Sequence, residues 1–575
     1  MKKLFVYMKG YGRAIVLSPL FKLIEATLEL LVPLVVAKII DKGIGGSDKG
    51  YIVRMCLLLG VLGIIGYLFS ITAQYFAAKT AVGFVTRVKH ALFAHLGKLS
   101  YEELDTLGTS TMITRITSDM NQIQTGLNLA LRLLLRSPFV VFGAMVMAFT
   151  IDTKAALTFA VAIPLLFLVV FSVMLASIPL YKKVQKALDS VVKSVRENLT
   201  GIRVIRAFCR EKTEEADFRK KNDALTARQK FVGRISALMN PVTFVIINLA
   251  TVWLIHEGAL RVEIGILTQG AVIALYNYMS QILIELIKAA DLFITITKAV
   301  ACGNRVEAVL EIPTGMKEYP EISADVKNSD AVRFEDVTLT YRGAGAPSLE
   351  KISFSVKKGE TVGVIGGTGS GKTSLVNLIG RFYDVSEGSV TVDGMDVRAY
   401  DTDALRQKIG IVPQKALLFR GSVRENLRFG NPDATDAELW TALETAQARK
   451  VVEDKEGGLD FVIEAGGRNL SGGQRQRLTI ARALVRKPEI LILDDSASAL
   501  DFATDAALRR ALKELDGEMT VFIVSQRTSS IAHADQIIVL DDGEIAAIGT
   551  HESLLETCDI YREIYESQFK KEAAV

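Results

Sequence analysis

Long apolar stretches alternate with polar segments over residues 1–300 of the chain. Six of them are long enough to cross about 30 Å of hydrocarbon as helices. They cover residues 14–40, 52–78, 129–151, 155–180, 236–258 and 264–292. A buried helix of a soluble protein is the alternative for any single stretch, but six in succession favour a membrane domain. This pattern predicts a helical transmembrane domain over residues 1–300 and excludes a soluble ATPase.

The connections between the predicted spans are uneven in length. Spans 2–3 and 4–5 are separated by about 50 residues each, and both connections are strongly basic. Basic loops stay in the cytoplasm, so we expect the N-terminus and the second half of the chain there, at a plasma (inner) membrane. Both loops keep a helical apolar pattern, which predicts helices that extend past the membrane and turn near 108–118 and 201–210. We call these two turns the tips and expect them to dock on the cytoplasmic domain. The alternative is that each tip packs on the helices that lead to it.

Charged residues lie in or near the predicted spans, where charge is costly and often functional. They are Lys22, Glu25, Glu29, Glu285 and Lys288. Two readings stay open. The i,i+3 spacing lets Lys22 pair with Glu25 and Glu285 with Lys288 along their helices, or these residues line a substrate pathway.

Composition narrows the class of protein. A length of 575 residues predicts at least two domains, and a net charge of +4 gives no indication of nucleic-acid binding. Cys56, Cys209, Cys302 and Cys558 are widely spaced and read as free thiols. The N-terminus lacks the small-residue cleavage site of a signal peptide. Residues 301–330 are polar, contain two prolines and predict a linker, which leaves 331–575 as the second domain.

The second domain carries a phosphate-binding loop. An apolar strand at 361–365 runs straight into a Gly-rich turn, and a helix follows, as this loop requires. Backbone N–H groups of such a turn surround phosphates, Lys372 adds positive charge and the Thr373 hydroxyl can ligate Mg²⁺. The helix N-terminus also favours anions. The predicted ATP-binding residues here are Gly366, Gly367, Thr368, Gly369, Ser370, Gly371, Lys372, Thr373 and Ser374.

Three further residues are predicted at this site. Asp494 follows a buried strand at 490–493 and can hold Mg²⁺ through water. Gln414 follows a short strand at 408–412 and can reach the metal or the attacking water. Tyr341 ends an alternating strand and can stack on adenine; an ordinary strand-end tyrosine is the alternative.

These motifs occur in a fixed order along the chain. Tyr341, the phosphate loop and Gln414 are followed by LSGGQ at 470–474, ILILDD at 490–495, SALD at 498–501 and a switch at 525–527. The chain resembles an exporter-type half-subunit of the ABC transporters over essentially its whole length. The resemblance implies a membrane α-helical domain, with six transmembrane helices extended into the cytoplasm, followed by an α/β P-loop nucleotide-binding domain.

The resemblance also implies a dimer with ATP between the phosphate loop of one chain and the LSGGQ segment of the other. Donors at a helix N-terminus suit the γ-phosphate. The residues offered to the opposite nucleotide are Ser471, Gly472, Gly473, Gln474 and Asp501.

Two positions depart from the family pattern, which has Glu after the Walker B aspartate and His in the switch. Asp495 and Gln526 stand there, so both catalytic positions are degenerate. Asp is one methylene shorter than Glu, and Gln cannot become a cation. His533 lies seven residues beyond Gln526, in what reads as the next helix, and cannot substitute. The pattern is similar to that of the degenerate-site subunit of bacterial heterodimeric multidrug exporters.

We therefore expect ATP-driven export of amphipathic small molecules by this chain together with a non-identical partner chain. Hydrolysis is expected mainly at the site that the intact LSGGQ segment completes on the partner. The alternatives are a lipid or peptide translocator of the same architecture and, less favoured, an ATP-gated regulatory or channel protein.

Overall fold

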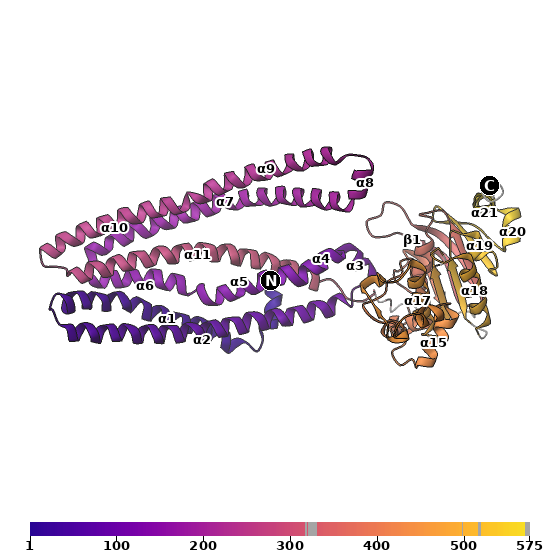
Figure 1. Ribbon diagram of the computed structural model, residues 1–575, viewed down its shortest axis with the longest axis horizontal. Coiled ribbons are helices and arrows are strands. Elements are labelled where there is room, and N and C mark those ends of the chain that lie inside the picture. The colour runs from indigo at the N-terminus through magenta and orange to yellow at the C-terminus, as the bar shows by residue number, and fades with distance from the viewer. Residues whose placement is uncertain (317–318, 320–329, 497, 516–518, 570–575) are drawn as a thin grey trace. The chain divides into compact units, whose positions relative to one another are not determined.

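The structure is a computed structural model that describes residues 1–575 except 317–318, 320–329, 497, 516–518 and 570–575. The chain divides into two compact units. One comprises Met1–Gly97 and Gly108–Ile312, and the other Lys98–Leu107 and Pro313–Val575. We call the first the helical unit and the second the sheet unit (Figure 1).

Long helices build the helical unit. They are α1 (Gly12–Lys38), α2 (Lys49–Leu96), α5 (Met120–Leu133), α6 (Arg136–Ile151), α7 (Thr153–Thr200), α9 (Glu211–Ala237), α10 (Met239–Glu263) and α11 (Gln269–Leu310), with short α4 (Thr109–Thr114) and α8 (Ile202–Ala207) between them. At 1.5 Å per residue, α2 and α7 are each about 70 Å long, more than twice the hydrocarbon thickness. The prediction that helices continue well past the membrane is confirmed.

The helices pack side by side within this unit. Helix α1 lies along α2, α7 along α9 and α10, and α11 against α5 and α6 (Figure 1). Small residues at the contacts let the backbones approach: a Cβ built on Gly126 would lie 2.2 Å from the Ala299 side chain. The buried Tyr278 hydroxyl donates a hydrogen bond to the Leu30 carbonyl at 2.6 Å.

Four stretches of the described chain are long and apolar enough to cross a membrane. They are Lys49–Leu96, Thr109–Ile151, Thr153–Thr200 and Glu211–Glu263. The predicted spans 14–40 and 264–292 fall on α1 and α11, which do not meet this criterion. Both helices carry charged side chains in these regions, among them Glu25 and Glu29 on α1 and Glu285 and Lys288 on α11.

Those charges are paired in the structure. The Lys22 ammonium lies 2.6 Å from Glu25, and the Lys288 ammonium 2.9 Å from Glu285, so the predicted i,i+3 pairs are confirmed. Arg136, which the sequence analysis did not single out, joins three helices. Its guanidinium lies 2.6 Å from both Glu285 on α11 and Glu29 on α1, and is itself buried.

Two main sheets build the sheet unit. One has the order β2-β1-β4-β5 and the other β12-β11-β3-β10-β9-β6, with a small β7-β8 pair besides. The strands are β1 (Val332–Leu339), β2 (Leu349–Val356), β3 (Thr361–Gly366), β4 (Glu387–Val392), β5 (Met395–Asp396), β6 (Ile409–Val412), β7 (Gly421–Ser422), β8 (Val462–Ile463), β9 (Ile490–Asp494), β10 (Thr520–Val524), β11 (Gln536–Asp541) and β12 (Glu544–Gly549).

The helices of the sheet unit surround these strands. They are α3 (Tyr101–Leu107), α12 (Lys372–Ile379), α13 (Thr402–Lys408), α14 (Val423–Arg428), α15 (Asp436–Thr445), α16 (Arg449–Glu453), α17 (Gly472–Leu484), α18 (Phe502–Glu514), α19 (Thr528–Ile531), α20 (His551–Thr557) and α21 (Asp559–Phe569). Successive side chains of the central strands point to opposite faces, as the strand period requires. On β9, Ile490 and Ile492 enter one hydrophobic cluster, and Leu491 and Leu493 the other.

The structure differs from the predicted boundaries in two places. The linker expected at 301–330 begins inside α11, because that helix continues to Leu310 before Pro313 follows. The first tip, expected near 108–118, is preceded by α3, and it is the segment Lys98–Leu107 that packs within the sheet unit. The second tip, expected near 201–210, contains the short helix α8, which exposes Val204; Phe208, directly after it, is also exposed.

Candidate functional site

Four adjacent parallel strands end at the same edge of the larger sheet. The register places Val412 of β6 beside Leu493 of β9, and Asp494 beside Val524 of β10. Val524 in turn pairs with Val364 of β3, which leads into the phosphate loop. The carboxyl ends of parallel strands are where such sheets bind ligands. Gln414, Asp494, Gln526 and the phosphate loop are thus brought together from distant parts of the sequence.

The glycines of the loop allow its close turns. Gly366 ends β3, and a Cβ built there would lie 2.1 Å from the Leu540 carbonyl oxygen. Gly371 has a φ of +90°, and a Cβ there would lie 2.6 Å from the Leu349 side chain. Both positions therefore exclude any larger residue. Helix α12 begins at the next residue, Lys372, so its free N–H groups face the loop.

The Lys372 ammonium is folded into the loop. It donates to the carbonyl oxygens of Gly366 at 3.0 Å and Gly367 at 2.5 Å, and reaches the Ser370 hydroxyl at 3.3 Å. Burial lowers the pKa of Lys372, while the carboxylates of Asp495 and Asp494 act to raise it. A phosphate at this position would replace the loop carbonyls as the partner of the cation.

Oxygen ligands suited to a hard cation lie beside the lysine. The Thr373 hydroxyl donates to the Asp494 carboxylate, with oxygen distances of 3.0 and 3.2 Å. Burial raises the pKa of Asp494, and the charge of Asp495 adds to this, while the Thr373 hydrogen bond and the Lys372 charge oppose it. A hydroxyl and a carboxylate are the ligand types that Mg²⁺ accepts, so these residues suit the metal predicted for them.

Asp495 and Gln526, the two positions that depart from the family pattern, line the same pocket. The Gln414 side-chain amide donates to the Asp495 carboxylate at 3.3 Å. Asp495 has a φ of +47°, a left-handed conformation that Asp tolerates better than most residues. The pocket has a volume of about 250 Å³. Of the predicted residues, its lining includes Thr368, Gly369, Gly371, Lys372, Thr373, Ser374, Gln414, Asp494, Asp495 and Gln526.

The predicted adenine partner lies next to this pocket and outside its lining. The Tyr341 hydroxyl donates to the Ser374 hydroxyl at 2.9 Å, and its ring meets Tyr383 edge-on at 5.0 Å. Burial raises the pKa of Tyr341. A neighbouring pocket of about 420 Å³ has Tyr341 and Tyr383 in its walls.

The LSGGQ segment also lies outside the lining of the phosphate pocket. Ser471 caps α17: its hydroxyl accepts from the Gln474 N–H at 3.3 Å, and the Gln474 side chain accepts from the Ser471 N–H at 3.0 Å. A Cβ built on Gly472 would have no atom within 4 Å. Asp501 likewise caps α18 by accepting from the Thr504 N–H at 2.9 Å. Within one chain, these groups therefore do not complete the pocket.

Helix α3 is held in the sheet unit by three contacts that the sequence analysis missed. The Tyr101 ring lies 4.7 Å from that of Phe382, and Glu103 forms a 2.9 Å ion pair with Arg342. The Tyr383 hydroxyl donates to Asp105 at 2.6 Å. No local pattern indicates contacts across such sequence separations. Three acidic residues beside one tyrosine at 101–105 are the one available signal.

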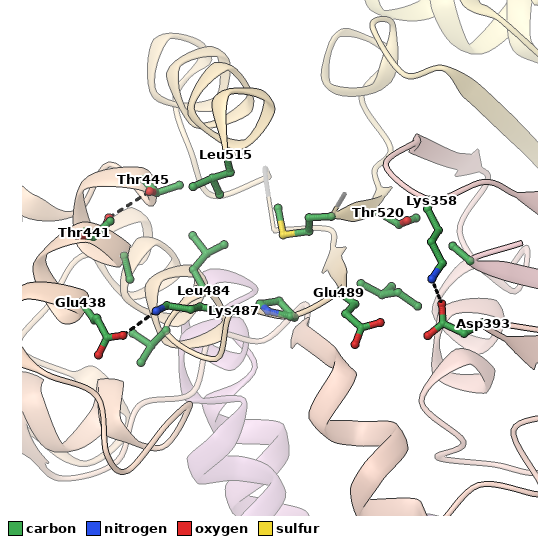
Figure 2. A pocket seen from close by; sticks show the side chains of 16 residues that line it. Lys358, Asp393, Glu438, Thr441, Thr445, Leu484, Lys487, Glu489, Leu515 and Thr520 are labelled. Carbon is green, nitrogen blue, oxygen red and sulfur yellow. Dashed lines mark hydrogen bonds and ion pairs between the residues drawn. The ribbon is translucent and has the colours of Figure 1, made fainter. Parts of the chain in front are cut away.

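Two larger pockets of the sheet unit contain none of the predicted site residues. The one in Figure 2 has a volume of about 670 Å³, and its charges are paired: Lys358 lies 3.0 Å from Asp393, and Lys487 2.7 Å from Glu438. The other, of about 490 Å³, is lined in part by His533. His533 lies in a turn after α19, not in a helix as expected, and is absent from the lining of the phosphate pocket.

Known proteins share both units. Residues 15–286 match the family described as ABC transporter transmembrane region, and residues 349–498 the family described as ABC transporter. The chain is 39% identical over 570 residues, 98% of its length and 97% of the relative's, to an uncharacterized ABC transporter ATP-binding protein of Mycobacterium tuberculosis (strain CDC 1551 / Oshkosh). It is 31% identical over 585 residues, 99% and 98% of the two chains, to the putative multidrug export ATP-binding/permease protein YgaD of Bacillus subtilis (strain 168).

A solved structure shares the fold. A bacterial Atm1-family ABC exporter with ATP bound has a TM-score of 0.81 to this chain at 24% identity, covering 97% of this chain and 99% of that one. The strand-end pocket, the phosphate loop and these similarities lead to one conclusion. The chain belongs to the ABC transporters, as an ATPase-coupled transporter of the exporter fold with a helical transmembrane domain followed by an ATP-binding domain.

Proposed function

We propose that the chain is one half of an exporter of amphipathic small molecules and works with a second, non-identical ABC half-transporter chain. Relatives described as multidrug proteins and the long apolar helices support this substrate class. The basic connections favour a plasma (inner) membrane location with six spans, and with the N-terminus and the ATP-binding domain in the cytoplasm.

The observation that carries the proposal is the pair Asp495 and Gln526 in the phosphate pocket. A carboxylate that stops about an ångström short of the water can lose on the order of 100-fold in rate. Gln526 can hydrogen-bond a γ-phosphate but cannot supply the charge of a protonated imidazole. The pocket thus retains the groups that bind ATP and lacks those that hydrolyse it fast.

Each remaining residue has a defined part in binding. The loop N–H groups and Lys372 hold the phosphates, while Thr373, Asp494 and Gln414 hold Mg²⁺. When bound, the metal neutralises charge on the phosphate oxygens. Tyr341 supports Ser374 and offers its ring to the adenine. This site holds ATP and keeps the two ATP-binding domains in contact.

The intact signature segment serves the partner. The Ser471 hydroxyl and the N–H groups of Gly472 and Gly473 at the start of α17 are donors available to a nucleotide held by another chain, with Gln474 beside them. Asp501 caps α18, and its carboxylate only accepts hydrogen bonds. Hydrolysis at that second site resets the transport cycle. The segments 98–107 and 201–210 carry the closure of the ATP-binding domains to the spans.

The test compares ATPase activity of the chain purified alone with that of the co-expressed pair. We expect at least about tenfold more turnover in the pair, because only that assembly contains a complete catalytic site. Asp495→Glu should raise the rate of the chain alone, by no more than about tenfold while Gln526 remains. Asp433→Glu makes the same chemical change at an exposed loop position and should leave the rate unaltered.

Fast hydrolysis by the chain alone, as two identical copies, would overturn the proposal. Transport into vesicles separates the remaining classes: uphill movement of a drug supports export, and purely downhill flux indicates an ATP-gated channel. Stimulation of the ATPase only by lipids or peptides would indicate a translocator of those substrates.

A further inference from the structure

The side chain of Gln568 on helix α21 reaches the switch segment. Its amide nitrogen donates to the Gln526 carbonyl oxygen at 2.7 Å. Its amide oxygen accepts from the Thr528 N–H and from the Thr528 hydroxyl, both at 3.0 Å. One amide thus satisfies backbone groups on both sides of Arg527.

The geometry resembles the pairing of neighbouring strands. Arg527 is extended, with φ −97° and ψ 121°, so the carbonyl before it and the N–H after it point to the same side. A side-chain amide that binds both groups restricts the φ and ψ angles between them. Because the held carbonyl belongs to Gln526, the same contact restricts ψ of Gln526 and with it the direction in which the Gln526 side chain leaves the backbone.

The opposite side of the segment is held as well. The Arg527 N–H donates to the Ser525 hydroxyl at 2.9 Å, and its guanidinium reaches the carbonyl oxygens of Ser498 at 3.2 Å and Leu500 at 3.4 Å. These carbonyls belong to the segment that ends at Asp501. The switch is therefore fixed between α21 and this segment.

Helix α21 is anchored near its start by a buried side chain. Tyr561, near its start, is fully buried in the hydrophobic cluster beneath the sheet. The Tyr561 hydroxyl lies 2.7 Å from the imidazole Nδ1 of His551 at the start of α20. Gln568 stands at the far end of the same helix.

We propose that Gln568 is a positioning residue for the switch, and that α21 thereby sets the preference of this site for ATP over ADP. Gln526 lines the phosphate pocket together with Lys372 and Asp494, where only ATP presents a γ-phosphate. The part played by Gln526 rests on the proposed function; the part played by Gln568 goes beyond it.

The test measures binding of fluorescent ATP and ADP analogues to the full chain purified without a partner. In Gln568→Leu the ratio of ATP to ADP affinity should fall about fivefold, roughly the value of one hydrogen bond. Gln526→Ala should lower the ratio at least as much, and the double variant should lose no more than Gln526→Ala alone. Glu563→Leu, at an exposed position of α21, is the matched control and should leave the ratio unchanged.

Gln568→Glu adds a second measurement, the pH dependence of the ratio of ATP to ADP affinity. A purely structural role of Gln568 would not produce such a dependence. The introduced carboxylate can still accept from Thr528 but repels the Gln526 carbonyl, whereas the protonated acid donates to that carbonyl again. Relative to the unaltered chain at each pH, the ratio should be low at pH 8 and recover towards pH 5.

The outcomes separate the two ideas. If Gln526→Ala lowers the ratio while Gln568→Leu and Gln568→Glu leave it intact, the inference is wrong and the proposed function stands. If Gln526→Ala has no effect on the ratio, both hypotheses are wrong: that Gln526 contacts the γ-phosphate, and that Gln568 positions the switch for this contact.

Discussion

At the scale of one residue, Asp494 lowers the stability of the folded protein but supplies a ligand for Mg²⁺. The carboxylate is buried beside Asp495, and burial raises its pKa despite the Thr373 hydroxyl and the Lys372 charge. The ionised form is thus less favourable in the folded protein than in the unfolded chain. The same carboxylate is the ligand that a bound Mg²⁺ needs.

Asp494→Asn should therefore stabilise the protein without nucleotide and abolish its response to Mg²⁺. The neutral amide removes an unfavourable charge at neutral pH, where the raised pKa makes ionisation costly. Thermal unfolding of the full chain in detergent should show a higher first midpoint without ligand, and adding Mg²⁺ to the ATP-bound variant should give no further rise. A lower midpoint without ligand would contradict this account.

The raised pKa also sets a pH dependence for metal binding. Protons compete with Mg²⁺ for the Asp494 carboxylate. The affinity for Mg²⁺ should therefore have its full value at neutral pH. On acidification it should fall at a higher pH than for an ordinary aspartate. In the absence of metal the sign reverses: protonation of Asp494 favours the folded state as the pH falls. Titration of Mg²⁺-dependent ATP binding between pH 7 and 5 measures the loss, with Asp494→Asn as the variant that lacks it.

Helix α17 illustrates a conflict at the scale of one element. Its first residues form a capping box. The Ser471 hydroxyl, which is proposed to face the partner's nucleotide, therefore also caps the N-terminus of the helix. Helix α14 begins with the same box, formed by Ser422 and Glu425, away from the predicted site residues. The chain therefore contains its own control for the structural part of the effect.

Ser471→Ala and Ser422→Ala should each lower the free energy of unfolding by about 1 kcal/mol, the usual value of such a cap. Only Ser471→Ala should reduce ATPase activity of the co-expressed pair, by roughly tenfold or more, because it also removes a donor to the γ-phosphate. Equal loss of activity in both variants would show that helix stability alone is responsible.

The packing of helices α1, α6 and α11 includes two ion pairs made by one arginine, Arg136. Removing Arg136 leaves Glu285 buried with the partially exposed Lys288 as its remaining cation, and a buried pair broken on one side typically costs about 3 kcal/mol or more. We expect Arg136→Met to lower the thermal midpoint in detergent strongly, and Arg136→Met with Glu285→Met to recover most of the loss. Arg219→Met breaks an exposed i,i+4 pair on α9 and should change it little. A midpoint unaffected by Arg136→Met would contradict a structural role for the cluster.

At the scale of the whole molecule, local patterns predicted the long helices and the strand, loop and helix around Lys372, and most residues predicted to bind the phosphates line one pocket. The strand, the glycines and Lys372 are contiguous, so the phosphate loop could be read directly, and the strand preceding Asp494 could be read in the same way. The missed features all join distant segments. Arg136 meets Glu285 from another helix, Asp105 meets Tyr383, and Gln568 meets Gln526. Apolar periodicity contains no information about such pairs, because they depend on the packing of whole elements.

The placement of Lys98–Leu107 in the sheet unit has a consequence for dissecting the protein. The polypeptide enters that unit twice, so a protease nick anywhere in 313–330 leaves the two fragments joined by α3. A truncated polypeptide starting at residue 331 would lose Tyr101, Glu103 and Asp105, and it would present the Phe382 and Tyr383 rings to solvent. Such a fragment should aggregate more and be less soluble than the same fragment with the missing decapeptide, residues 98–107, added as a separate peptide.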